Sequence, residues 1–93
     1  MPTFRGTPVD LVVDVRTFLE YWLGHLPGAV RMPFQSIGTR MPARTDLGKD
    51  ARILVYCASG ARSAMAAQTL RGLGYRRVID GGAMASARDG LTP

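Results

Sequence analysis

Two short runs of apolar, largely β-branched residues dominate the hydrophobic pattern of the chain. One covers residues 10–15 (DLVVDV) and the other covers residues 52–56 (RILVY). Runs of this length with little polar alternation are typical of strands that are buried on both faces of a parallel sheet. Two weaker strands are predicted at residues 29–32 and at residues 77–80, the second directly before a pair of glycines.

The first predicted helix begins at Thr17. Thr17 and Glu20 have the spacing of a capping box, in which the Thr hydroxyl accepts an amide N–H bond and the Glu carboxylate reaches back. Gly24 can end this helix. Its four large apolar side chains share one face: Phe18, Leu19, Trp22 and Leu23. We expect Phe18 and Trp22 to pack in the core.

A longer helix is predicted over residues 62–73. Ala66, Leu70 and Leu73 recur there at positions i, i+4 and i+7, which is the spacing of one helical face. Gly74 supplies the left-handed residue that commonly follows a helix.

The remaining segments give weaker signals. A short helix is expected over residues 34–41, a polar loop over residues 42–51, and an Ala-rich helix after the glycine pair. Residues 1–8 show no periodicity and are predicted to form an N-terminal arm, which leaves residues 9–93 as the folded domain. Because strands alternate with helices, we expect an α/β fold with a mainly parallel sheet and right-handed crossovers.

Length and charge narrow the classes of function. The chain has 93 residues, 46% of them hydrophobic, which suits one compact domain. Its formal charge is +5, but its basic residues are dispersed, with only Arg76 and Arg77 adjacent. A nucleic-acid surface would need clustered basic residues with interleaved aromatics, so we expect no nucleic-acid partner and instead a small anionic substrate. The protein is expected to be a monomer.

No apolar run approaches the roughly 20 residues that a membrane-spanning helix needs, so we expect no membrane association. The chain shows no export signal, which favours the cytoplasm and leaves the periplasm open if a leader was removed. The single cysteine and single histidine cannot form an internal disulfide or a usual zinc site. We therefore expect neither metal nor cofactor.

The single cysteine, Cys57, lies where a predicted strand meets a predicted helix. In open α/β sheets, ligands bind at the carboxyl ends of the strands, and amides at a helix start favour anions. A cysteine beside such amides and an Arg has its pKa lowered, which makes it a nucleophile. The alternative is a buried, inert cysteine. The expected anion-binding residues follow Cys57 directly: Ala58, Ser59, Gly60, Ala61, Arg62 and Ser63.

The length of this loop separates two chemistries. Four residues lie between Cys57 and Arg62, whereas phosphatase loops of the tyrosine-specific type need one residue more to wrap a phosphate. The tighter ring favours an extra sulfur atom on Cys57, with the cysteine at the mouth of the ring, over phosphatase or arsenate reductase chemistry. Elsewhere, Asp14 and Arg16 are interpreted as an ion pair at a strand end, and His25 as a structural residue of a turn.

Four segments in order resemble the rhodanese family, and in length the chain is similar to the short periplasmic rhodaneses of the phage shock protein E type. The segments are Asp14–Arg16 with Glu20, residues 24–29 with Pro33, residues 57–63, and residues 70–75 with Gly81–Gly82. The resemblance implies a three-layer α/β domain with a small, mainly parallel sheet of about four or five strands flanked by helices.

The resemblance also implies an activity. Family members are sulfurtransferases of the thiosulfate type, in which the loop cysteine takes sulfur from an anionic donor as a persulfide and passes it to a thiol or to cyanide. In this chain Cys57 would be the nucleophile, the amides of residues 58–63 would hold the persulfide, and Arg62 would orient the anion. Two alternatives stay open, a persulfide carrier or sensory module without turnover and a non-enzymatic interaction domain.

Overall fold

A computed structural model describes all residues, 1–93, and its centre is a parallel sheet of four strands. The strand order is β4-β3-β5-β6, with β3 at Leu11–Asp14, β4 at Val30–Arg31, β5 at Arg52–Cys57 and β6 at Arg77–Ala83. The two apolar runs of the sequence form the two central strands, because each is buried on both faces of the sheet. The expected α/β fold with a parallel sheet is confirmed.

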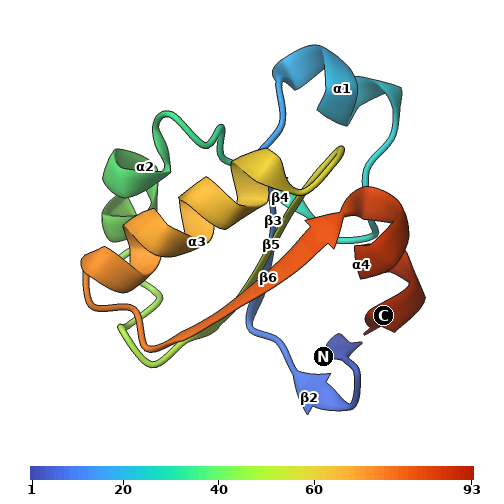
Figure 1. Ribbon diagram of the computed structural model, residues 1–93. Coiled ribbons are helices and arrows are strands. Elements are labelled where there is room, and N and C mark those ends of the chain that lie inside the picture. The colour runs from blue at the N-terminus through green and yellow to red at the C-terminus, as the bar shows by residue number, and fades with distance from the viewer.

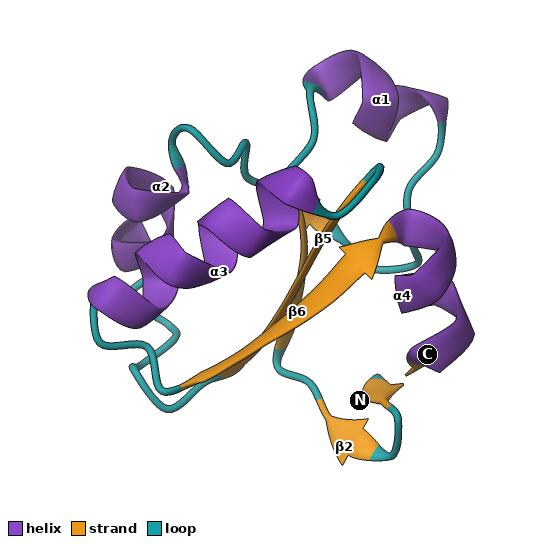
Figure 2. Cartoon of the chain, in the orientation of Figure 1, coloured by secondary structure: helices purple, strands orange, loops and turns teal.

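Helices cover both faces of this sheet, and one helix stands apart. The helices are α1 at Phe18–Leu23, α2 at Ile37–Ala43, α3 at Ala61–Gly72 and α4 at Met84–Gly90. Helices α2 and α3 lie together on one face, α4 lies on the other, and α1 sits beyond the carboxyl ends of the strands (Figure 1). The layers are easiest to follow with helices and strands in separate colours (Figure 2).

The central strand β5 shows how the sheet divides the core in two. Ile53, Val55 and Cys57 belong to the cluster on the side of α2 and α3. Leu54 and Tyr56 belong to the other cluster, with residues of α4 and the N-terminal segment. Since side chains alternate between the faces of a strand, the position of Cys57 in the sequence fixes its side chain on the α3 side.

The N-terminal segment predicted as an arm contains two strands. Thr3–Phe4 (β1) pairs antiparallel with Thr7–Pro8 (β2) and with Leu91–Thr92 (β7), so the two ends of the chain share a small second sheet. Phe4 is buried in the core cluster of the α4 side. The domain boundary at residue 9 stays a prediction, but the segment before it is folded against the rest.

Strand β6 is longer than the sequence predicts. It continues through Gly81 and Gly82 to Ala83, with a register irregularity where it passes the end of β5. An added Cβ at Gly81 would lie 3.0 Å from Leu54 Cδ1 and 3.1 Å from the Val55 carbonyl oxygen, so the glycine allows β6 to approach β5. The glycine pair is therefore part of the strand, whereas the predicted strand ended before it.

Two further expectations are corrected by burial. Phe18 and Trp22, predicted as core residues, are 63% and 70% exposed, and α1 has no buried residue at all. Leu73, predicted on the buried face of α3, is also exposed.

The predicted short helix α2 begins three residues later than expected, at Ile37 rather than residue 34, and extends through Pro42 to Ala43. No helix has the length and apolar character needed to cross a membrane.

Candidate functional site

The candidate site is the loop that joins β5 to α3, at the carboxyl edge of the sheet (Figure 2). Cys57 is the last residue of β5, and α3 begins at Ala61. Between them Gly60 has φ +107°, in the left-handed region that other residues rarely adopt. An added Cβ there would meet nothing closer than 3.9 Å, so the backbone angle, and not space, requires glycine.

Backbone amides of this loop converge on the sulfur of Cys57. The amide of Gly60 donates to Sγ at 2.9 Å and the amide of Ser63 donates at 3.4 Å. The Cys57 side chain is fully buried at the floor of the loop, whereas we expected it at the mouth. Of the six expected anion-binding residues, Ala58 and Ala61 are exposed and donate no bond to the sulfur.

The environment of Cys57 favours the thiolate on balance. Burial is the largest influence and disfavours the charged form, but hydrogen bonds from Ser63, Gly60 and Ser59 outweigh it, so the pKa of Cys57 lies below its ordinary value. These donors surround an atom that is removed from water, where each bond to a charge is stronger. The predicted activation of this cysteine by loop amides therefore has a geometric cause.

Ser63 links this loop to the edge strand β6. Its Oγ lies 2.8 Å from Asp80 Oδ1 and 3.0 Å from the Gly60 carbonyl oxygen. The same Asp80 oxygen accepts the amide of Gly82 at 2.9 Å. Sequence reasoning selected Ser63 for its amide and missed Asp80, which lies 17 residues away in the chain.

Arg62 is turned toward α1. Its Nη1 and Nη2 donate to the two carboxylate oxygens of Glu20 at 2.7 and 3.0 Å. This two-point pair lowers the pKa of Glu20 to about 2. We expected Arg62 to orient an anion, but its terminal nitrogens are already engaged, and its first structural effect is to tie α3 to α1.

A buried polar network lies beneath the site. The single Nε–H of Arg16 is shared between the two Asp14 carboxylate oxygens, each at 3.0 Å. Its Nη2 donates to Asp14 Oδ2 at 2.7 Å and to the Gly24 carbonyl oxygen at 2.6 Å. The Tyr56 hydroxyl donates to Asp14 and accepts the Leu26 amide. Burial raises the pKa of Tyr56. The predicted ion pair at the end of β3 is confirmed, and Tyr56 is a partner that the sequence did not reveal.

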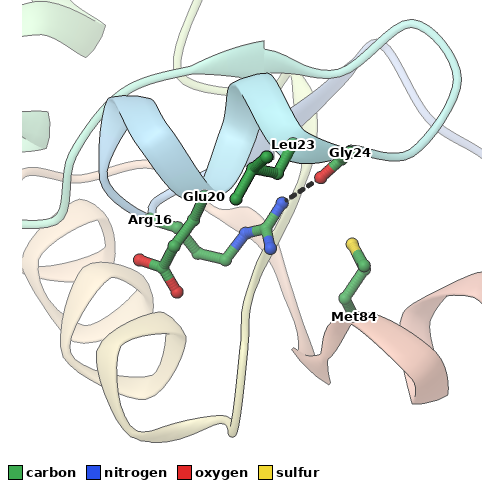
Figure 3. Close-up of a pocket in the computed structure, with 5 residues that line it drawn as sticks. All are labelled: Arg16, Glu20, Leu23, Gly24 and Met84. Carbon is green, nitrogen blue, oxygen red and sulfur yellow. Dashed lines mark hydrogen bonds between the residues drawn. The ribbon is translucent and has the colours of Figure 1, made fainter.

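A cavity of about 280 Å³ opens between α1 and α4. Figure 3 shows its lining: Arg16, Glu20, Leu23, Gly24 and Met84. The cavity lies beside the loop, because its lining residue Glu20 pairs with Arg62. Met84, on its other side, directly follows Ala83, which lies opposite Cys57 in the sheet. His25, interpreted as structural, lies outside this group and stacks its ring on Tyr21.

Fold and site together define an α/β domain with a recessed cysteine whose thiolate is stabilised by a loop of backbone amides. The Rhodanese-like domain family matches residues 4–88. A sulfurtransferase of Allochromatium vinosum is 42% identical over 83 residues, which span 87% of this chain and 75% of that protein. The chain belongs to the rhodanese-like domain family.

Two further similarities differ in extent. The putative sulfur carrier protein YrkF of Bacillus subtilis is 36% identical over 69 residues, and the match spans 74% of this chain but only 36% of that protein. A structure described as a rhodanese with anions from E. coli superposes with a TM-score of 0.79 at 26% identity, over 88% of this chain and 95% of the other. The fold of the whole domain is therefore that of a rhodanese.

Proposed function

We propose that this protein transfers a sulfane sulfur from an anionic donor such as thiosulfate to a thiol or cyanide, through a persulfide on Cys57. The observation that carries the proposal is the pair of amide bonds, from Gly60 and Ser63, to Cys57 Sγ. Donors preorganised around a developing negative charge lower the barrier to reactions that form it. The Cys57 thiolate and the terminal sulfur of its persulfide each carry such a negative charge.

In the first step the Cys57 thiolate attacks the outer sulfur of thiosulfate. The Sγ–S bond forms, the S–S bond of thiosulfate breaks, and sulfite leaves with the electron pair of that bond. The lowered pKa of Cys57 supports this step because it raises the fraction of thiolate at neutral pH. No proton has to be moved if the cysteine is already ionised.

In the second step an acceptor thiolate, or cyanide, attacks the outer sulfur of the persulfide. The acceptor leaves as its own persulfide, or as thiocyanate, and the electron pair of the broken S–S bond returns to Sγ. The same amides then hold the regenerated thiolate, so one set of donors serves both half-reactions. Because the same amides act in both half-reactions, a short loop is sufficient for this chemistry and needs few side-chain contacts to the sulfur.

Arg62 is proposed to support donor binding through its charge, although Glu20 holds its terminal nitrogens. We expect Arg62→Ala to raise the KM for thiosulfate more than the KM for an uncharged sulfane donor. Equal losses for charged and uncharged donors would contradict a role in anion binding.

Steady-state turnover with thiosulfate and cyanide tests the proposal. We expect thiocyanate formation by the full chain with double-displacement kinetics, and none by Cys57→Ser of unchanged thermal stability. The similarity to a putative sulfur carrier makes a carrier the second candidate. A protein that accepts one sulfur on Cys57 but turns over negligibly with any small donor would be a carrier, and one that accepts none would have neither function.

A further inference from the structure

The exposed face of α1 is the largest feature that the proposed chemistry does not use. Its four large apolar side chains are exposed by 61% to 71%: Phe18, Leu19, Trp22 and Leu23. Scattered apolar residues are normal on a protein surface, but a contiguous group of this size marks a binding surface. We call these four residues the α1 face.

Polar bonds, together with the partly buried Tyr21, hold α1 in this position. The capping box of Thr17 and Glu20 is formed, and the Tyr21 hydroxyl donates to the Ala29 carbonyl oxygen at 2.6 Å. Glu20 also binds Arg62 on α3. The helix is thus fixed at both ends while its large apolar side chains face outward, where a bound partner would bury them.

The α1 face is joined to the catalytic loop by two direct links. Glu20, on the same helix, pairs with Arg62, which lies five residues beyond Cys57. Leu23 belongs to the face and also lines the cavity beside the loop, across from Met84 (Figure 3). A partner that covers the face therefore reaches the rim of the Cys57 loop.

The charged groups around the α1 face indicate which kind of partner would bind there. Arg31 forms no ion pair, and its guanidinium carbon lies 5.7 Å from the centroid of the Phe18 ring. The charges of Arg16 and Arg62 are offset by paired carboxylates, and the whole chain carries +5. A second copy would bring like charges together, and a nucleic acid would leave the apolar residues uncovered. An acidic protein surface with apolar residues would match both the positive charge and the exposed apolar side chains of the α1 face.

We infer that the α1 face docks the sulfur acceptor, and that this acceptor is an acidic protein segment carrying a cysteine beside apolar residues. The inference rests on the proposed persulfide chemistry. In the docked complex the acceptor thiolate attacks the outer sulfur of the Cys57 persulfide, its own S–S bond forms, and the electron pair of the broken bond returns to Cys57 Sγ. Cys57 itself is fully buried, so docking would help by holding the acceptor thiolate in line with the persulfide that this residue carries.

Synthetic cysteine peptides of equal length test this inference on the full chain loaded with persulfide. One peptide is acidic and apolar, one acidic and polar, and one basic and apolar, and glutathione is the reference. We expect the acidic apolar peptide to receive sulfur fastest. In the double variant Leu19→Ser, Trp22→Ser, the ratio of its rate constant to that of glutathione falls by about tenfold, as expected for loss of an apolar hot spot.

Two further variants sharpen the test. Leu73→Ser removes an exposed leucine that lies outside the α1 face, and its ratio should stay within about twofold of wild type. Arg31→Glu should reverse the preference between the acidic and the basic apolar peptides. Thermal unfolding of each variant separates lost docking from lost folding.

Each contrary result has a distinct meaning. Persulfide that forms and moves with the same peptide-to-glutathione ratio in the double variant would overturn the docking inference and leave the proposed function standing. A wild-type dimer in sedimentation that Trp22→Ser converts to monomer would assign the face to a second copy and overturn the inference. Absence of any persulfide on Cys57 would end the proposed function and the inference together.

Discussion

Helices α1 and α3 both begin at the carboxyl edge of the sheet, each after a buried strand, but α3 runs back along a face of the sheet whereas α1 stays beyond the edge (Figure 1). Their apolar residues accordingly differ in burial. Helix α3 buries small and medium side chains against the sheet: Ser63, Ala66, Ala67 and Leu70. Helix α1 has no fully buried residue and exposes larger side chains, and its Tyr21 packs partly buried against the core. The comparison shows that apolar spacing identifies a helix, whereas contact with another element decides whether its apolar face is core or surface.

Truncating one leucine in each helix should give the largest difference between them, measured as loss of free energy of unfolding. Leu70→Ala is expected to lower the free energy of unfolding by about 3 kcal/mol, because the side chain is fully buried and leaves a cavity. Leu19→Ala, on exposed α1, should change it by less than about 0.5 kcal/mol. Chemical denaturation of both variants measures the difference, and similar losses would contradict the assignment of α1 as surface.

Gly60→Ala tests the loop from which α3 begins. Holding alanine at φ +107° should cost about 1–2 kcal/mol and shift the amide that binds Cys57 Sγ, so persulfide formation should slow. Gly48→Ala is the matched control, since Gly48 has no positive φ and its added Cβ meets nothing within 4 Å. Stability and activity are measured together, and a Gly60→Ala protein with normal rates would show that this amide is dispensable.

Ser63→Ala should raise the pKa of Cys57. Burial opposes the thiolate at this position, and the Ser63 side chain is one of the influences that offset it. Its Oγ also lies against the Gly60 carbonyl oxygen and Asp80, so it helps to hold the loop whose amides bind the sulfur. The pH at which the thiolate absorbs in the ultraviolet should therefore move upward relative to wild type. Ser59→Ala is the control, because Ser59 acts through its backbone amide, which the substitution keeps. An unchanged pKa of Cys57 in Ser63→Ala would show that the Ser63 side chain does not stabilise the thiolate.

The Glu20–Arg62 pair, which joins the two helices, should contribute only modestly to stability. Its side chains are 32% and 26% exposed, so a double-mutant cycle of Glu20→Gln and Arg62→Ala should give a coupling of about 0.5–1 kcal/mol. The more exposed pair Arg44–Asp46 should give less.

The same pair predicts the sign of a pH dependence. The pKa of Glu20 is lowered from 4.5 to about 2, so the unfolded chain binds more protons between these values. The stability that Glu20 contributes is present above pH 4.5 and is lost as the pH falls through about 2. Glu20→Gln should therefore flatten the acid limb of the stability curve, and an identical acid limb would contradict the pairing.

The fold was largely predictable because its signals are local. The β-branched runs at residues 10–15 and 52–56 became central strands, and the Thr17–Glu20 capping box formed as expected. Strands β1 and β7 have two residues each and exist through pairing between the chain ends, which no local pattern encodes. The longer β6 likewise depends on how closely Gly81 approaches β5.

The candidate site was predictable where backbone geometry dominates. A cysteine between a strand and a helix meets amides wherever the loop is short, and Gly60 is the residue that permits the turn. The side-chain partners were not predictable, since Arg62 and Glu20, like Tyr56 and Asp14, are separated by 42 residues. Only the folded sheet brings these pairs together.

Intact-mass spectrometry before and after thiosulfate treatment tests the central claim most directly. The wild-type chain should gain the mass of one sulfur atom, a thiol acceptor should remove it, and Cys57→Ser should gain nothing. A folded wild-type protein with a free Cys57 thiol and no added sulfur would contradict the account.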